Sequence, residues 1–261
     1  MTAAAPLLEL EGVSKRFGPV QALDRVDFAV HEGEVVGLVG DNGAGKSTLV
    51  KTIAGIHSAD TGSVRFGGNE VSISKPQDAT ALGIATVYQD LALCDNLDVV
   101  ANVFLGKEEI SPGPGRISRQ LDEARMEHRA GELLSSLAVT IPSLRSEVGT
   151  LSGGQRQQVA VARSLLGEPK VVLLDEPTAA LGVPQTAQVL ELIRRLKERG
   201  LGVVVISHNL VDVFEVADRI VVLRLGRATG DFAAESTTEE HVVAAITGAD
   251  GESGKEAKGD G

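Results

Sequence analysis

The chain has 261 residues, of which 43% are hydrophobic and 23% charged, as is usual for a soluble folded protein of one domain with or without an embedded subdomain. Its net charge of −11 argues against a nucleic-acid-binding protein, because contacts to phosphates need clustered Lys and Arg. The single Cys94 excludes an intrachain disulfide and fits a reducing compartment, and no apolar run approaches the roughly 20 residues that span a bilayer.

The first part of the chain is rich in predicted strands. Residues 7–13 alternate apolar and polar side chains, and residues 20–30 do so less cleanly. Residues 34–39 then form an apolar run that stops at Gly40, and a helix is expected to begin at Lys46.

Between this strand and this helix lies a match to the P-loop pattern. Its glycines let backbone N–H groups surround an anion, and the helix N-terminus adds positive charge. Lys46 is predicted to reach the β- and γ-phosphates and Ser47 to bind Mg²⁺, whereas the alternative is a glycine-rich turn with an exposed lysine. The predicted nucleotide contacts are Gly40, Asp41, Asn42, Gly43, Ala44, Gly45, Lys46, Ser47 and Thr48.

The middle of the chain, residues 97–166, shows little strand character and several amphipathic segments. One of these, residues 121–137, follows the Pro-Gly-Pro-Gly turn at 112–115. We expect a helical subdomain inserted into the remainder of the fold.

Strand patterns return in residues 171–174 and 203–206, both continuously apolar, with a helix predicted between them over residues 184–199. This order predicts a right-handed crossover unit and an α/β core. The first strand ends in two carboxylates: Asp175 is predicted to hold Mg²⁺ through water and Glu176 to polarise the water that attacks the γ-phosphate. The alternative is a solvated acidic turn.

After Gly226 a turn is expected to lead to a last helix, opened by Thr237 and Glu240 at capping-box spacing. Residues 249–261 have almost nothing to bury, and we expect a disordered tail there. The Asn-Lys-x-Asp stretch with which GTPases usually bind guanine is absent, which favours adenine.

The stretch Leu-Ser-Gly-Gly-Gln at 151–155 resembles the signature motif of ABC ATPases, and it precedes Asp175 at the spacing usual in that family. The resemblance covers residues 7–248. It implies a P-loop NTPase (RecA-like) α/β core over residues 1–89 and 167–248, an N-terminal antiparallel β subdomain and an inserted α-helical subdomain over residues 90–166. It also implies that the signature completes the ATP site of an opposite subunit through Ser152, Gly153, Gly154 and Gln155; taken alone, the motif would be a loop before a helix cap.

Three further roles follow from the resemblance. Phe17 matches the aromatic residue that stacks on adenine, with a core or hairpin aromatic as the alternative. Gln89 matches the residue that senses Mg²⁺ and the attacking water, which makes Ser47, Gln89 and Asp175 the predicted metal ligands. His208 matches the switch histidine at the γ-phosphate, although a lone histidine is more often structural. Glu176, His208 and Gln89 are the predicted catalytic residues.

One position departs from the family pattern. Where most members carry an Asp that crosses the dimer interface, this chain has Gly182, so that communication between the two sites is expected to differ. Three stretches, residues 87–96, residues 178–183 with this turn, and residues 206–209 running on to 216–219, are similar to the bacterial simple-sugar importers. A single P-loop and a single signature make the chain most similar to the fructose and xylose type, which pairs with a second copy.

The resemblance implies an ATPase subunit on the cytoplasmic face of the cell membrane that couples Mg-ATP hydrolysis to monosaccharide uptake. Its implied partners are a second copy, two membrane permease subunits and an extracytoplasmic sugar-binding protein, with residues 90–105 docking on the permeases. The alternatives are the ATPase subunit of an exporter and a soluble, non-transport ABC ATPase.

Overall fold

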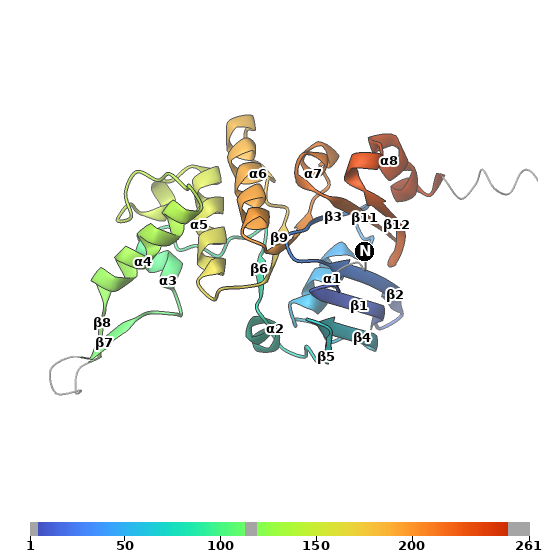
Figure 1. Cartoon of the computed structure of the whole chain (residues 1–261), viewed down its shortest axis with the longest axis horizontal. Helices are drawn as coiled ribbons and strands as arrows, with labels where there is room; N and C mark the ends of the chain where they lie inside the picture. Colours follow the sequence, from blue (N-terminus) through green and yellow to red (C-terminus); the bar gives the residue numbers. More distant parts are fainter. Residues whose placement is uncertain (1–4, 113–118, 250–261) are drawn as a thin grey trace, which may run out of the picture.

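A computed structural model describes residues 5–112 and 119–249. Two β-sheets and the helices around them make up most of this part of the chain (Figure 1). The predicted disordered tail lies almost entirely outside the described residues.

The N-terminal sheet is antiparallel, in the order β2-β1-β4-β5. Alternate residues Leu8 and Leu10 of its strand β1 are buried, as the period of a strand requires. The strands are β1 (Leu8–Phe17), β2 (Val20–Val30), β4 (Thr61–Phe66) and β5 (Asn69–Val71).

The central sheet has the order β12-β11-β3-β10-β9-β6, with β12 antiparallel at one edge and the other strands parallel. The strands β3 and β10 are buried throughout, which explains their continuous apolar runs. Its strands are β3 (Val35–Val39), β6 (Ile84–Val87), β9 (Val171–Asp175), β10 (Gly202–Ile206), β11 (Arg219–Arg224) and β12 (Arg227–Ala233).

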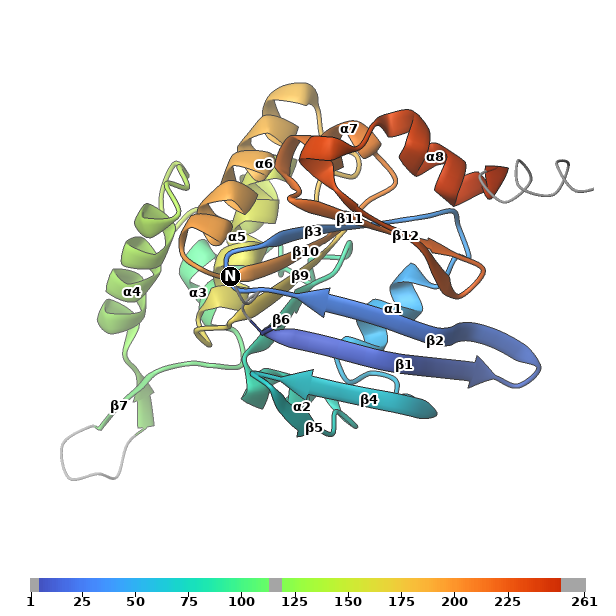
Figure 2. The ribbon, with the colours of Figure 1, turned by 45° about the vertical axis from the view of Figure 1, so that its right-hand side comes forward.

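Two hydrophobic clusters cover opposite faces of this sheet. Helix α5 (Gly153–Leu165) and helix α6 (Val183–Glu198) pack on the face of Val203 and Val205. Helix α1 (Lys46–Ile53) and the N-terminal sheet pack on the face of Val204 and Ile206. Figure 2 shows the resulting layers, with α6, α7 (Leu210–Val216) and α8 (Glu239–Thr247) on one side and α1 on the other. The predicted α/β core is confirmed, including the parallel pair β9 and β10 joined by α6.

The middle of the chain is mainly helical, with α3 (Val99–Phe104), α4 (Glu123–Ser136) and α5, while α2 (Pro76–Leu82) precedes β6. It also contains a hairpin that was not predicted, formed by β7 (Ile110–Pro112) and β8 (Arg119–Leu121) and standing away from the central sheet (Figures 1 and 2). The predicted helix start at Leu121 was wrong because Leu121 pairs with Ile110 in this hairpin, and Asp122 caps α4 instead.

Two predictions near the C-terminus were also wrong. The turn after Gly226 leads first to β12, whose mostly exposed side chains give no apolar run to signal an edge strand. The last helix is capped by Thr238 rather than Thr237: the Thr238 hydroxyl accepts from the His241 N–H, while the Thr237 hydroxyl is buried without a hydrogen-bond partner among the described residues.

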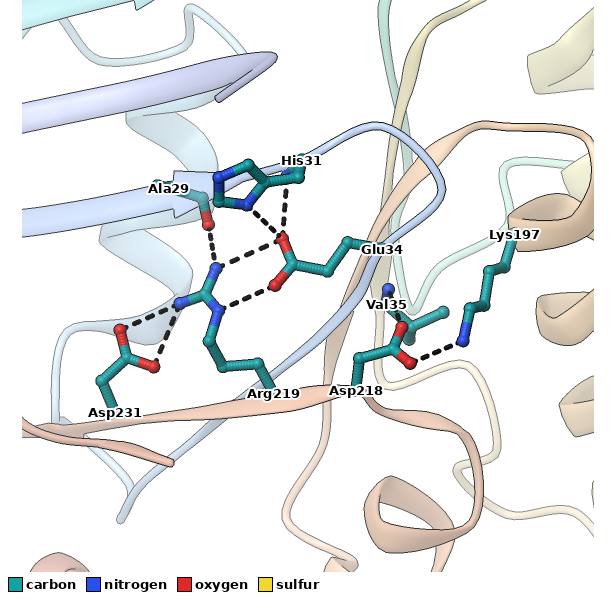
Figure 3. A network of polar contacts seen from close by, with 8 residues as sticks. All are labelled: Ala29, His31, Glu34, Val35, Lys197, Asp218, Arg219 and Asp231. Atoms are coloured by element: carbon teal, nitrogen blue, oxygen red, sulfur yellow. Dashed lines mark hydrogen bonds and ion pairs between the residues drawn. The ribbon is translucent and has the colours of Figure 1, made fainter. Parts of the chain in front are cut away.

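A polar network ties the amino ends of the central strands together (Figure 3). The Arg219 guanidinium donates to both oxygens of Glu34, to the Asp231 carboxylate and to the Ala29 carbonyl. Beside it, Asp218 accepts from the Val35 N–H and from Lys197. These contacts join β2, β3, β11 and β12 at one end of the sheet.

Candidate functional site

The predicted P-loop lies at the carboxyl end of β3 and leads into α1, in the setting that a phosphate-binding loop needs. Gly40 has φ 146°, and a Cβ there would lie 2.1 Å from the Leu223 carbonyl oxygen. Gly45 has φ 108°, and a Cβ there would lie 2.7 Å from the Ala22 oxygen. Both glycines are therefore required by the packing of the loop against neighbouring backbone.

The N-terminus of α1 offers its amides without competition from a side chain, because its N-cap residue is Gly45. The first amides of a helix have no intrahelical acceptor, and together with the helix dipole they form an anion site. The predicted contacts Lys46, Ser47 and Thr48 occupy this first turn, and Asp41, Asn42, Gly43 and Ala44 form the loop before it.

Lys46 is only 8% exposed and donates from Nζ to the carbonyl oxygens of Gly40 and Asp41. Burial lowers the pKa of its ammonium group, against the nearby charges of Glu176, Asp41 and Asp175. The ammonium group thus lies in the loop with only neutral backbone acceptors, which an anionic phosphate would outcompete.

Asp175 ends β9, where it pairs with Ile206 of β10, and Glu176 follows at the carboxyl edge of the sheet. Burial raises the pKa of the Asp175 carboxyl, and the neighbouring Glu176 raises it further, against the charges of Lys51 and Lys46. Glu176 has φ 51°, a left-handed conformation that is strained for a residue with a side chain, and its N–H donates to the Ile206 oxygen at 2.8 Å.

The structure brings His208 to Glu176. The His208 Nδ1 atom lies 2.9 Å from both carboxylate oxygens, but the geometry of a hydrogen bond is met only at Oε1. Oε2 is buried and has no hydrogen-bond partner among the described residues. A buried carboxylate oxygen without a partner is costly, and a ligand or water bonded to Oε2 would relieve that cost.

Gln89 follows β6 and shares a cavity of about 440 Å³ with Glu176. Gly153, Arg156 and Leu181 contribute to the same cavity. The predicted sensor glutamine and the predicted base therefore open onto one space.

The signature residues open helix α5. Ser152 is its N-cap: the Ser152 hydroxyl accepts from the Gln155 N–H at 3.2 Å, and the Gln155 side chain accepts from the Ser152 N–H at 3.0 Å. A Cβ on Gly154 would lie 3.0 Å from Cβ of Gln185 at the start of α6, and one on Gly153 would lie 2.9 Å from Leu181. Because α5 and α1 belong to opposite faces of the central sheet, the chain does not bring its own signature to its own P-loop.

Phe17 lies at the end of β1 and is 42% exposed. Its ring meets the His57 ring edge-on, with 5.0 Å between centroids, and the Lys15 ammonium lies 5.7 Å from its centroid. A partly exposed aromatic ring is able to stack on a base, and His57 was not singled out by any sequence motif.

The proposed metal ligands Ser47, Gln89 and Asp175 supply a hydroxyl, an amide oxygen and a carboxylate, which are the oxygen donors that Mg²⁺ prefers. The described residues contain no group of three or more His, Cys, Asp or Glu side chains placed to hold a metal ion. A magnesium ion here would thus depend on phosphate and water oxygens as well as on the protein. No helix in the described ranges combines the length and the apolar character needed to cross a membrane.

Comparison with known proteins gives consistent matches. The ABC transporter family model matches residues 23–179. The chain is 48% identical to the fructose import ATP-binding protein of Rhizobium meliloti, covering 95% of this chain and 96% of that protein. It is 46% identical to the xylose/arabinose import ATP-binding protein of Sulfolobus acidocaldarius, covering 92% and 94%.

Solved structures of ATP-binding cassettes share the fold, which confirms the predicted fold class. One, in its ADP conformation, has a TM-score of 0.79 and 26% identity, covering 94% of this chain and 96% of the other. Another, a dimeric bacterial ABC transporter cassette, has a TM-score of 0.71 and 27% identity, covering 88% and 100%.

Proposed function

The chain belongs to the ABC transporter family and is an ATPase of that family, and from this premise we propose that it is the ATP-hydrolysing subunit of a monosaccharide importer. The observation that carries the proposal is the similarity, over nearly the full length of both chains, to sugar import proteins with a single ATP-binding module. The cargo is proposed to be a pentose or hexose.

In the proposed ATP site, the amides of residues 43–48 and the Lys46 ammonium group bind the phosphates, and Phe17 stacks on adenine. Gly40, Asp41 and Asn42 form the wall of the loop. Ser47, Asp175 and Gln89 would hold Mg²⁺ directly or through water, and the ion would neutralise charge on the β- and γ-phosphates. The raised pKa of Asp175 predicts that this metal site weakens as the pH falls, because the carboxyl group protonates at a higher pH than usual.

Glu176 is the proposed general base. Its Oε1 atom is engaged by His208, whereas Oε2 is free to accept a proton from the water that attacks the γ-phosphate. His208 keeps the carboxylate in place and, being 72% exposed, can also contact the transferred phosphate. The step forms a bond between the water oxygen and the γ-phosphorus and breaks the bond between the γ-phosphorus and the β,γ-bridging oxygen, so that ADP and inorganic phosphate are the products, while Glu176 takes the proton of the water.

The proposed active form is a homodimer. Since the signature and the P-loop of one chain belong to opposite faces of the sheet, a second copy would have to bring Ser152, Gly153, Gly154 and Gln155 to the phosphates. Gly182 leaves no side chain for a contact across that interface, so we propose that Leu181 and Gln185, which pack on Gly153 and Gly154, connect each Glu176 turn to the signature.

The proposed membrane partners are two permease subunits, with the chain on the cytoplasmic face and a sugar-binding protein on the outside. Residues 90–105 are the proposed docking segment, with no role for nucleic acid. They border a cavity of about 310 Å³ lined by Tyr88, Leu91, Leu105 and Arg163 among others. Arg163 fixes the segment by donating to the Leu91 and Ala92 carbonyls. Disulfide trapping from cysteines introduced at Leu93 or Asn96 to a permease loop tests this contact.

The proposal is tested by uptake of labelled pentoses and hexoses in cells with and without the chain. If the chain drives import, uptake of a sugar is lost without it and is restored by the parent chain but not by the variant Glu176→Gln. This variant should bind Mg-ATP, accumulate as a dimer and hydrolyse ATP at least about a hundredfold more slowly than the parent. Export of the sugar, or activity without membrane partners, would favour the exporter or the soluble ATPase instead. Parental turnover by Glu176→Gln would show that the base is misassigned.

A further inference from the structure

A partly buried hydrogen bond joins the two segments that carry Glu176 and His208. The Thr178 hydroxyl donates to Asp212 Oδ2 at 2.6 Å. Asp212 is 7% exposed and lies in the first turn of α7, whereas Thr178 lies two residues after Glu176. The contacts Glu176–His208 and Thr178–Asp212 therefore connect the same two segments at two points.

The Glu176 segment needs such a support because its backbone is strained. Glu176 and Ala180 have φ 51° and 59°, and left-handed conformations of this kind are unfavourable for residues with a side chain and persist only when the surroundings enforce them. The Glu176 N–H bond to Ile206 holds one end of the segment to β10. The Ala179 and Leu181 N–H groups bond only within the segment, to the oxygens of Glu176 and Thr178.

The packing of helix α7 fixes the position of Asp212, which forms the second of these contacts. Val213, next to Asp212, is fully buried, and its Cγ1 atom lies 2.4 Å from the position that a Cβ on Gly37 of β3 would occupy. This close packing against the central sheet fixes the Asp212 carboxylate relative to β3 and β10. His208 itself is 72% exposed, so the packing of its own ring contributes little to its position.

We propose that Thr178 and Asp212 are a positioning pair that holds the Glu176 carboxylate where it can accept the proton of the attacking water. Neither residue contacts the nucleotide in this proposal; both act through the conformation of the segment 176–180. The inference rests on the proposed role of Glu176 and adds two residues to which the sequence motifs assign no role.

The decisive variant is Thr178→Val, which keeps the shape of the side chain and removes the hydroxyl. Hydrogen bonds to charged groups contribute roughly 1.5–3 kcal/mol, and about 1.4 kcal/mol corresponds to a tenfold change in rate. We expect kcat for ATP hydrolysis to fall about tenfold or more, with KM for ATP within about twofold of the parent. Thr178→Ser, which restores the hydroxyl, should recover most of the rate.

The matched control is Thr229→Val, which removes a hydroxyl of β12 that donates to the Ala245 carbonyl of α8, away from Glu176. It should leave kcat unchanged. Asp212→Asn, which keeps a weaker acceptor, should lower kcat in the same direction but less than Thr178→Val, and serves if the valine variant does not fold. In a Glu176→Gln background, Thr178→Val should leave ATP-driven dimerisation unchanged, because only the proton-accepting step is affected.

Parental kcat in Thr178→Val would overturn the pair, as would a serine variant as slow as the valine variant. If kcat falls in proportion to the unfolding free energy, and does so to the same extent in Thr178→Val and Thr229→Val, the Thr178–Asp212 hydrogen bond has only a structural role. If Glu176→Gln is inactive while Thr178→Val is parental, only the positioning pair fails. If Glu176→Gln turns over at the parental rate, the proposed base fails and the pair with it.

Discussion

The two ends of the central sheet differ in how their charged side chains are paired. At the amino end, the Arg219 guanidinium bonds both the Glu34 and the Asp231 carboxylates (Figure 3). At the carboxyl end, Lys46 donates only to backbone carbonyls, and Oε2 of Glu176 is buried without a described partner. The amino end is complete by itself, whereas at the carboxyl end the lysine has no anionic hydrogen-bond partner, and one oxygen of the Glu176 carboxylate has no hydrogen-bond donor, among the described residues.

The pKa values of the two ends shift in opposite directions. Burial alone would raise the pKa of Glu34, but the hydrogen bond from Arg219 and the His31 N–H bond outweigh it, and the pKa lies below its usual value. Burial also raises the pKa of Asp175, and there the adjacent Glu176 adds to the effect. The charged groups at the amino end therefore stabilise the fold. At the carboxyl end the adjacent carboxylates Asp175 and Glu176 interact unfavourably, and a bound ligand would relieve this interaction.

The largest effect is expected for Lys46→Ala, at the carboxyl end. Removing the only buried lysine among the described residues should weaken ATP binding by about a hundredfold or more, because a charge-assisted contact to phosphate is lost in a dry site. Unfolding free energy should change little, since the lysine is bonded only to backbone oxygens. Equilibrium binding of a fluorescent ATP analogue measures this, with the exposed Lys75→Ala as the control. Unchanged affinity would contradict the assignment of the loop.

Arg219→Met should produce the reverse pattern at the amino end. It leaves Glu34 and Asp231 without their shared partner, and we expect a loss of about 2–3 kcal/mol in unfolding free energy with ATP affinity unchanged. The matched control is Arg227→Met, which removes an ion pair with Asp24 in which the Arg227 side chain is 61% exposed, and it should destabilise the fold much less. Urea denaturation measures both. Equal losses in the two variants would remove the distinction between a complete network and an ordinary surface pair.

The same network predicts a pH dependence. Because the folded-state pKa of Glu34 is depressed, its contribution to stability is fully present above the unfolded-state value of about 4.5 and is lost as the pH falls through the folded value. The stability difference between the parent and Arg219→Met should therefore shrink as the pH is lowered from 7 to below about 4.

The buried strands and the P-loop could be predicted from the sequence because local patterns dictate them. Continuous apolar runs predicted β3, β9 and β10, and the glycines at 40 and 45 are required by close backbone approach. The edge strand β12 was missed because its mostly exposed side chains give no apolar run, and the hairpin strands β7 and β8 were missed because each is only 3 residues long. The cap of α8 was misplaced by one residue because Thr237 and Thr238 are chemically equivalent in the sequence.

The site was predictable only where a motif names its residues. The ends of parallel strands converge at one edge, which is why Asp175, Glu176 and His208 could be expected together. The bond between Thr178 and Asp212 spans 34 positions and depends on how α7 packs against β3, which no local pattern encodes. The roles assigned to Phe17, Gln89 and the signature residues remain predictions.

The smallest change in stability, and the one that contrasts the two ends most directly, is expected for Asp175→Asn. The raised pKa means that the ionised carboxylate is a net cost to the folded state at neutral pH, since stability falls as the pH rises from the unfolded-state value of 3.8 through the folded value. The asparagine variant should consequently have a higher thermal midpoint than the parent at pH 7, an advantage that disappears near pH 4, while Mg²⁺-dependent hydrolysis is lost. Glu34→Gln should lower the midpoint at pH 7 and leave hydrolysis intact. Calorimetry of both variants without nucleotide or metal gives the two signs, and a lower midpoint for Asp175→Asn would mean that the carboxyl end is as well satisfied as the amino end.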